Sequence, residues 1–335
     1  MRPFKYTNAS SSAAAISLLL QNPSAQFLAG GTNLIDLMKE DVERPDELID
    51  LTRLDLTTIS PLSAGQGGVS IGALGKNTDA ANHPIIREHF PLLSRAIFAG
   101  ASAQIRNMAT NGGNLLQRTR CPYFYDTAMP CNKRSPGSGC AAKDGFNRMH
   151  AILGWSEACV AVYPSDMAVA LSALDASVKV IQADGKTRSI SIHDFHRLPE
   201  NHPEKDNTLK RGELISSITI PKNGFAGNSA YIKVRDRNSY AFALVSVGAG
   251  LAMDGNTITT AHIALGGVAH KPWRAWKAEA LLKGKTATEA NFRIAAEAEM
   301  EQARALSYNK FKIVLGKNTI INALKMAAEG AKRRG

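Results

Sequence analysis

The sequence predicts an α+β protein with two domains. Its 335 residues, 44% of them hydrophobic, are enough to form two separate cores. Short strand-like and helix-like segments alternate up to about residue 224, and beyond residue 228 strand-like segments precede helix-like ones. We therefore expect a first domain over residues 1–224 and a second over residues 225–335. The boundary falls in the Gly-, Lys- and Asn-containing segment 222–228.

The first domain is expected to begin with short elements that alternate between strand and helix. Residues 10–20 have the pattern of an N-capped amphipathic helix. The further expected elements are strands at 25–31, 46–54, 67–73, 177–184, 186–195 and 213–221, and helices at 33–40, 91–100 and 165–176. Residues 111–165 interrupt this order, because they are rich in Gly, Pro, Cys, Asn and Arg and show little periodicity. So long an irregular stretch inside a compact domain indicates either function or disorder.

The second domain is expected to place three strands before three helices. The strands are predicted at 229–235, 241–253 and 257–269, and the helices at 275–285, 287–303 and 309–332. This order is typical of an α+β domain.

A glycine loop is the first candidate binding motif. Ala29-Gly30-Gly31-Thr32-Asn33 follows a predicted strand and precedes a predicted helix. Paired glycines let a backbone approach a ligand closely, and the helix offers its N-terminus to an anion. The loop suits a pyrophosphate, although a tight turn with no ligand fits the same letters. Neither the Rossmann G-x-G-x-x-G spacing nor a P-loop is present.

Two further motifs have a related character. The segment 105–115, IRNMATNGGNL, combines a glycine pair with amide side chains and follows Ala99-Gly100-Ala101-Ser102. The segment Pro164-Ser165-Asp166-Met167 begins a helix, and its carboxylate suits a ribose or ribityl hydroxyl. If Asp166 only caps the helix, it does not indicate a bound sugar or ribityl chain.

Taken in order, these segments resemble one known family. AGGTNLIDLMK, GALGKNTD, IRNMATNGGNL, PSDMAVALSALDA and ALGGVAHKPWR look like the FAD-binding subunit of molybdenum hydroxylases, which include xanthine dehydrogenase, carbon monoxide dehydrogenase and 4-hydroxybenzoyl-CoA reductase. The resemblance extends from about Phe4 to Ala328. It implies an FAD-binding fold of the vanillyl-alcohol oxidase (PCMH) type with two subdomains, followed by a C-terminal α+β domain of the carbon monoxide dehydrogenase flavoprotein type.

The resemblance also implies which residues bind FAD. Lys233 matches a family lysine near the isoalloxazine edge, where a cation would stabilise the reduced flavin, and Tyr240 is a candidate to stack on the ring. This chain reads P-S-D where the family has P-x-S-D, which weakens the transfer to Asp166. The implied residues are Leu28, Ala29, Gly30, Gly31, Thr32, Asn33, Leu34, Ile35 and Asp36 around the pyrophosphate, and Ala101, Ser102, Thr110, Gly113, Asn114, Asp166 and Lys233 around the flavin, ribityl chain and ribose.

All four cysteines lie in the irregular stretch. Cys121, Cys131, Cys140 and Cys159 have the spacing C-x9-C-x8-C-x18-C within the 49 residues between Asn114 and Pro164. Four thiolates suit a [4Fe–4S] cluster, a tetrahedral zinc or two disulfides. Zinc sites usually contain a C-x2-4-C pair, which is absent here. Family members with such an inserted loop, including periplasmic aldehyde oxidoreductases, to whose flavin subunit this chain looks most similar, hold a [4Fe–4S] cluster in it.

The formal charge of +11 allows nucleic-acid binding or the binding of anionic cofactors and acidic partners. No basic stripe with interleaved aromatic residues appears, so we expect no nucleic-acid partner. Arg118, Arg120, Lys133 and Arg134 in the cysteine loop suit a negatively charged cluster or an acidic electron acceptor such as a ferredoxin; an exposed, solvated loop is the alternative. No stretch approaches the length of a membrane span.

The resemblance implies an electron-transfer subunit with FAD and a [4Fe–4S] cluster. Substrate oxidation would occur on a large subunit with a molybdenum cofactor, and a small subunit would carry two [2Fe–2S] clusters. We expect a periplasmic location through co-export with a signal-bearing partner, and otherwise a cytoplasmic one. The alternatives are a stand-alone FAD oxidase of the vanillyl-alcohol type, a flavin subunit of another molybdenum hydroxylase, and a zinc-binding scaffold without redox activity.

Overall fold

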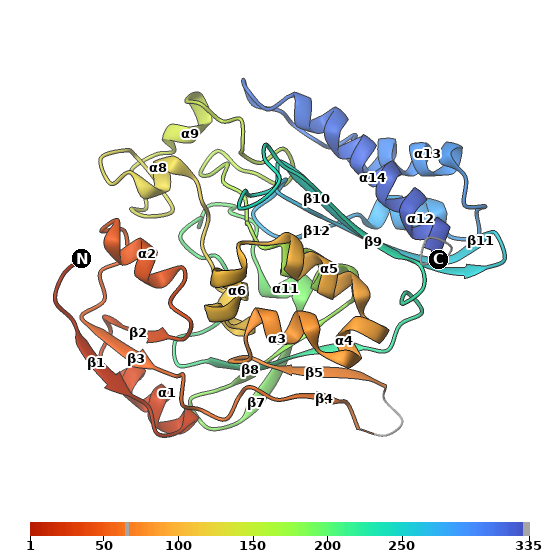
Figure 1. The fold of residues 1–335 in the computed structure, drawn as a ribbon. Helices are drawn as coiled ribbons and strands as arrows, with labels where there is room; N and C mark the ends of the chain where they lie inside the picture. Colours follow the sequence, from red (N-terminus) through yellow and green to blue (C-terminus); the bar gives the residue numbers. More distant parts are fainter. Residues whose placement is uncertain (64–66, 331–335) are drawn as a thin grey trace.

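The computed structural model describes residues 1–63 and 67–330 and contains three β-sheets, each with its own helices (Figure 1). The basic run Lys332-Arg333-Arg334, which the sequence suggests is a solvated tail, lies outside the described residues. The expected α+β class is confirmed. No helix among the described residues has the length and apolar character needed to cross a bilayer.

The first sheet is small and parallel. Its strand order is β1-β3-β2, with β1 at Lys5–Asn8, β2 at Ala25–Leu28 and β3 at Glu47–Asp50. Helix α1 (Ser12–Gln21) connects β1 to β2, and Ser11 caps it by accepting from the N–H of Ala14. The buried side chains of this helix, Ala15, Ile16 and Leu19, form a core with the strands. Helix α2 (Leu34–Lys39) follows β2 across the glycine loop.

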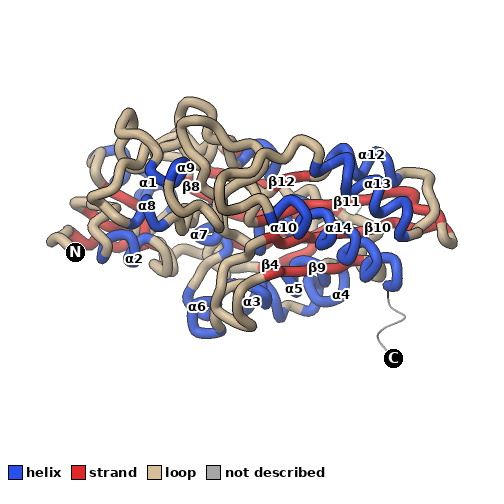
Figure 2. The backbone as a smooth tube through the Cα atoms, turned by 90° about the horizontal axis from the view of Figure 1, so that it is seen from above, coloured by secondary structure: helices blue, strands red, loops and turns tan. Residues whose placement is uncertain are grey.

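The second sheet is antiparallel and has the order β4-β5-β8-β6-β7. Helices α5 and α10 pack on it, and their other side contacts the third sheet (Figure 2). Its strands are β4 (Ile59–Pro61), β5 (Gly68–Gly72), β6 (Ser177–Ile181), β7 (Thr187–Ser191) and β8 (Leu214–Pro221). The helices of this part are α3 (Asn77–Asn82), α4 (Pro84–His89), α5 (Pro91–Ala99), α6 (Ala103–Met108), α7 (Asn111–Leu115), α10 (Asp166–Ala173) and α11 (Ile192–Phe195).

The third sheet is antiparallel with the order β12-β11-β10-β9, and three helices cover its outer face. The elements are β9 (Ser229–Val234), β10 (Val245–Asp254), β11 (Thr257–Gly266), β12 (Trp273–Arg274), α12 (Trp276–Leu282), α13 (Glu289–Met300) and α14 (Phe311–Glu329). A separate hydrophobic core lies between this sheet and its helices. Helix α14 ends at Gly330, which has a φ of 54°.

The cysteine-bearing stretch, which we call the insertion and define as residues 115–163, is ordered. It contains two short helices, α8 (Pro122–Tyr125) and α9 (Ala141–Asp144), which are drawn above α2 in Figure 1. Phe124 of α8 is fully buried and packs with Leu37 of α2 and with Cys131. The insertion therefore has a small hydrophobic core that includes one face of α2.

Candidate functional site

A cavity of about 1190 Å³ lies between the glycine loop, helices α6 and α7, and the N-terminus of α10. Its size is that of a site for a large cofactor. Most of the residues expected to bind FAD line it. These are Leu28, Ala29, Gly30, Gly31, Thr32, Asn33, Leu34, Asp36, Ala101, Thr110, Gly113, Asn114 and Asp166.

The glycine loop is packed so closely that side chains are excluded. A Cβ at Gly30 would lie 2.1 Å from the carbonyl oxygen of Met108, and Gly31 has a φ of 71°. The backbone N–H groups of Gly31, Thr32 and Asn33 have no protein acceptor among the described residues. The loop therefore presents free donors to the cavity.

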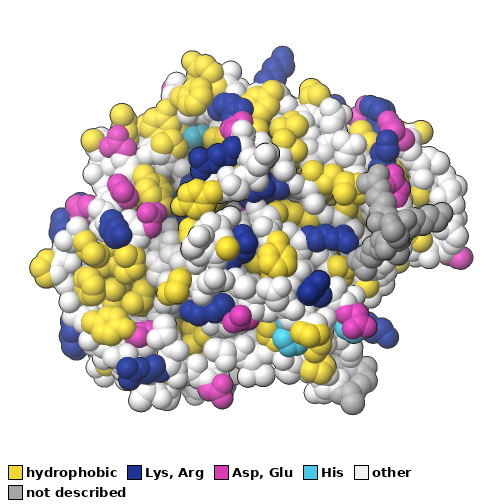
Figure 3. All heavy atoms as spheres, in the orientation of Figure 1, with side chains coloured by type: hydrophobic (Ala, Val, Ile, Leu, Met, Phe, Trp, Pro, Cys, Tyr) yellow, Lys and Arg dark blue, Asp and Glu magenta, His cyan; other side chains and the backbone are white. Residues whose placement is uncertain are grey.

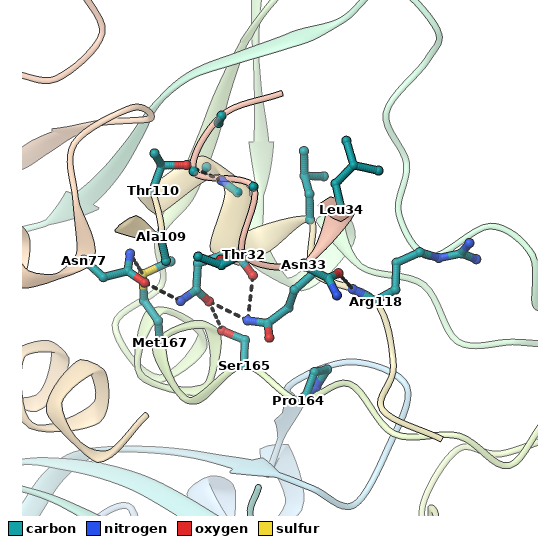
Figure 4. Close-up of a pocket in the computed structure, with 18 of the residues that line it drawn as sticks. Thr32, Asn33, Leu34, Asn77, Ala109, Thr110, Arg118, Pro164, Ser165 and Met167 are labelled. Atoms are coloured by element: carbon teal, nitrogen blue, oxygen red, sulfur yellow. Dashed lines mark hydrogen bonds between the residues drawn. The ribbon is translucent and has the colours of Figure 1, made fainter. Parts of the chain in front are cut away.

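Within the described part of the chain, two side-chain nitrogens in the cavity wall are buried without a hydrogen-bond partner. Asn33 accepts a hydrogen bond from the N–H of Arg118 at 2.8 Å, which leaves its own Nδ2 unpaired (Figure 4). Nε of Arg106 is unpaired in the same way, and burial lowers the pKa of this side chain. Unpaired buried donors are costly in a folded protein, so these two indicate a ligand that accepts hydrogen bonds.

The far wall of the cavity is held by a network of amide and hydroxyl side chains. Asn114 donates to Asn77 at 2.7 Å and accepts from the hydroxyl of Ser165 at 2.6 Å. Thr110 caps α7 by accepting from the N–H of Gly113. Asn77 and Ser165, labelled in Figure 4, were not named as site residues, although both lie in the motifs GALGKNTD and PSDMAVALSALDA that carry the resemblance.

Asp166 lies in the wall, but its carboxylate is already hydrogen-bonded within the protein. Tyr231 donates to Oδ1 at 2.6 Å and Lys233 donates to Oδ2 at 2.8 Å. The N-cap of α10 is Ser165 and not Asp166, so the reading of Asp166 as an N-cap was wrong.

Three expected residues are absent from the cavity wall. Lys233 pairs with Asp166, and its side chain is only 4% exposed. Its ammonium group therefore does not line the cavity. Ser102 caps α6 by accepting from the N–H of Ile105. Ile35 is on the side of α2 that packs against Gly31. Tyr240, in contrast, lines the cavity, is 56% exposed and has a φ of 50°.

The insertion brings the four cysteines into one region. Cys131 and Cys140 pair in an isolated antiparallel bridge, and Cys159 is close enough to Cys140 for the two thiols to shift each other's pKa. Cys121, at the start of α8, is close enough to Cys131 and Cys140 to interact with them electrostatically. None of the four forms a disulfide.

Backbone N–H groups converge on these sulfur atoms. The N–H groups of Ala142, Lys143 and Val160 hydrogen-bond Cys140, and together with the stronger effect of the Cys159 thiol they lower the pKa of Cys140 to about 6. The pKa of Cys159 is raised, mainly by that same bond to Cys140. Burial raises the pKa of Cys121 to about 12, although the N–H groups of Tyr123 and Phe124 act in the opposite direction.

These sulfur atoms are not arranged around a single ion. No group of three or more His, Cys, Asp or Glu side chains within residues 1–63 and 67–330 has the geometry of a metal-ion site. A tetrahedral zinc needs its four ligand atoms on one metal, whereas the cysteines of an iron–sulfur cluster each bind a different iron and are more widely spaced.

The basic side chains of the insertion are used to attach it to the rest of the protein. Arg118 pairs with Glu43 at 2.5 Å and with Asp206 at 2.8 Å, and Lys133 pairs with Asp206 at 2.5 Å. Arg134 donates to backbone carbonyls of α8. Arg118 and Lys133 are therefore engaged in ion pairs with acidic residues outside the insertion.

Arg120 stacks on the ring of Phe242 with its Cζ 5.2 Å from the centroid. On the face shown in Figure 3, Lys and Arg side chains are dispersed among other residues and form no continuous stripe.

A second cavity of about 220 Å³ lies next to the large one. Cys121 and His150 line it, and it shares Arg120, Ser165 and Asp166 with the wall of the large cavity. The fold thus places Cys121 in a cavity that borders the candidate cofactor site.

The chain belongs to the family of FAD-binding subunits of the molybdenum hydroxylases. The family model for the FAD-binding domain in molybdopterin dehydrogenase matches residues 2–223, and that for the carbon monoxide dehydrogenase flavoprotein C-terminal domain matches residues 229–310. As a member of this family the chain is an oxidoreductase subunit.

Particular relatives extend along most of the chain. The aldehyde oxidoreductase FAD-binding subunit PaoB of Escherichia coli strain K12 is 50% identical over 98% of this chain and 99% of that protein, which confirms the resemblance expected from the motifs. The glyceraldehyde dehydrogenase medium chain of Sulfolobus acidocaldarius is 30% identical over 84% of this chain and 82% of its own length.

Solved structures confirm the expected fold. Quinoline 2-oxidoreductase from Pseudomonas putida 86 has a chain with a TM-score of 0.75 and 25% identity, covering 98% of both chains. A carbon monoxide dehydrogenase chain from Oligotropha carboxidovorans has a TM-score of 0.76 at 22% identity, covering 99% of this chain and all of that one.

Proposed function

We propose that this chain is the FAD- and [4Fe–4S]-containing electron-transfer subunit of a heterotrimeric, molybdenum-dependent aldehyde oxidoreductase. The observation that carries the proposal is the proximity of two features. A cavity of cofactor size with unpaired donors in its wall shares wall residues with a small second cavity, and Cys121, one of the four cysteines, lines that second cavity. The relatives that support aldehydes as the substrate class are the two aldehyde-oxidising enzymes named above.

The residues of the large cavity fit FAD. The free N–H groups of Gly31, Thr32 and Asn33, with Nδ2 of Asn33, suit the oxygens of a pyrophosphate. Thr110, Gly113 and Asn114 would lie along the flavin and ribityl chain, with Asp166 at a sugar hydroxyl. Lys233 would act through Asp166, to which it donates a hydrogen bond at 2.8 Å. FAD suits such a subunit because it accepts electrons singly and releases one or two.

The cysteine group fits an iron–sulfur cluster better than the alternatives. The Cys159 thiol and nearby backbone N–H groups favour the thiolate of Cys140, which is the form that binds iron, whereas burial at Cys121 and the Cys140 sulfur at Cys159 favour the thiol of those two residues. The absence of a single-ion geometry among the described residues argues against the zinc-binding scaffold. We therefore assign Cys121, Cys131, Cys140 and Cys159 to a [4Fe–4S] cluster.

The partners follow from the family. A large subunit would carry the molybdenum cofactor and the aldehyde site, and a small subunit would carry two [2Fe–2S] clusters that deliver electrons to this chain. An external acceptor such as a ferredoxin would receive them. A periplasmic location by co-export is part of the same proposal.

The test is anaerobic purification of the tagged chain from its own cells, followed by addition of an aldehyde. We expect two partner subunits, one with molybdenum and one with [2Fe–2S] clusters, and bleaching of the flavin absorbance by an aldehyde. Reoxidation of the chemically reduced flavin by 4-hydroxybenzoyl-CoA, with no bleaching of the flavin by an aldehyde, would instead favour another molybdenum hydroxylase. Bleaching of the flavin absorbance by an alcohol, in the chain purified without partner subunits, would favour the stand-alone oxidase.

A further inference from the structure

His150 lies within the insertion, between Cys121 and the second cavity. Its Nε2 is 3.1 Å from Sγ of Cys121, a normal distance for a hydrogen bond to sulfur. Its ring is 3% exposed, and Nδ1 has no partner among the described residues. A neutral imidazole has one N–H, and a thiolate only accepts, so a bond to the Cys121 thiolate places that hydrogen on Nε2.

The backbone of His150 is fixed from three directions. Its carbonyl oxygen accepts from Nζ of Lys312 at 2.8 Å and from Nδ2 of Asn309 at 3.2 Å, and its N–H donates to Asn147 at 3.1 Å. Lys312 is fully buried at the start of α14 and donates also to the carbonyl of Gly267. The C-terminal domain therefore fixes the position of a residue that contacts a cysteine of the insertion.

Backbone N–H groups of Tyr123 and Phe124 act on the Cys121 sulfur as well. Among the described residues, however, Cys121 is the cysteine whose sulfur contacts a histidine ring. Cys121 is also the cysteine that lines the second cavity, next to residues shared with the large cavity. A hydrogen bond at this sulfur thus acts on the side of the cysteine group that faces the candidate flavin site.

We propose that His150 is a positioning residue that donates an Nε2–H hydrogen bond to the Cys121 thiolate and thereby raises the reduction potential of the cluster assigned to the four cysteines. The inference rests on the proposed function, because it needs that cluster. Its physical basis is that a donor to a ligand sulfur stabilises the form with more negative charge, which is the reduced cluster.

The experiment is a redox titration of three variants in the whole complex, with the reduced cluster followed by electron paramagnetic resonance. His150→Phe keeps an aromatic ring without a donor, and His150→Gln keeps an N–H donor. His89→Gln is the control, because the His89 side chain is 59% exposed and lies outside the insertion. We expect a more negative cluster potential in H150F, and potentials close to that of the unaltered protein in H150Q and H89Q.

An unchanged potential in H150F, with a full complement of iron, would overturn the inference. Should H150F lose its cluster, protein labelled with 15N-histidine decides the question. Pulsed paramagnetic resonance of the reduced cluster should detect one weakly coupled 15N nucleus that disappears in H150Q, and absence of that coupling would also overturn it. Absence of iron from the unaltered protein would instead contradict the cluster assignment itself.

Discussion

Lys233 and Asp166 form a buried ion pair at the wall of the large cavity. Nζ of Lys233 lies 2.8 Å from Oδ2 of Asp166, and the two side chains are 4% and 8% exposed. Lys233 donates also to the carbonyl of Ala99, and Tyr231 donates to the second oxygen of Asp166. The lysine on β9 therefore links the C-terminal domain to the helix that begins at the candidate flavin site.

Replacing Lys233 by Met should leave the Asp166 carboxylate buried and unpaired. We expect the free energy of unfolding to fall by about 3–5 kcal/mol and the flavin content per chain to decrease. Thermal unfolding and flavin absorbance measure the two effects. Lys179→Met, at an exposed position on β6, is the matched control. Equal stability and flavin content in both variants would show that the ion pair is dispensable.

Gly30→Ala should disturb the glycine loop through the backbone that lies against it. The added methyl would meet the carbonyl oxygen of Met108 at 2.1 Å, and neither backbone segment can move without changing the cavity wall. We expect loss of most of the bound flavin, measured after purification in excess FAD. Gly227→Ala has open space around its Cβ and should retain flavin like the unaltered protein. Full flavin occupancy in G30A would contradict the proposed role of the loop.

Asp206→Asn should weaken the attachment of the insertion in a pH-dependent way. Burial acts to raise the pKa of Asp206, but Lys133 and Arg118 outweigh it, and the pKa is lowered. A lowered pKa gives stability that is present above the pKa of about 3.9 in the unfolded chain and is lost as the pH falls through the folded value.

The stability difference between the unaltered protein and D206N should therefore be constant from about pH 6 to pH 8 and shrink below about pH 4. Chemical unfolding at a series of pH values measures it. A difference that grows toward acid pH would contradict this assignment of the network.

Cys140→Ser should remove the proposed cluster and leave the proposed flavin bound. No cysteine lines the large cavity, so flavin binding should persist while the iron content falls. Iron and flavin are determined on the same sample. Concurrent loss of flavin would mean that the insertion supports the fold of the cavity more strongly than its contacts indicate.

Sequence patterns predicted the fold well where they are periodic or contain motifs. The helix at residues 165–176 and the long strands of the third sheet were found, and so was the glycine loop. Helices α3 and α6 were missed, because each is only six residues long and polar. The insertion, with little periodicity, was expected to be functional or disordered; it is ordered by the burial of Phe124 against α2.

Site residues were harder to predict than elements, because side-chain direction depends on distant partners. The sequence did not indicate that Lys233 pairs with Asp166, an acidic residue 67 positions earlier in the chain. Nor did it indicate that Arg118 and Lys133 both pair with Asp206, which lies far along the sequence from both. His150 was not predicted as a site residue, since its contact with Cys121 crosses 29 residues.

The most direct measurement of the central claim is the absorbance spectrum and iron content of the chain purified without oxygen. The account predicts flavin bands together with broad absorption near 400 nm, and about four irons per chain. Flavin bands without iron, or with a single zinc, would contradict the cluster assignment, and absence of flavin would contradict the assignment of the large cavity to FAD.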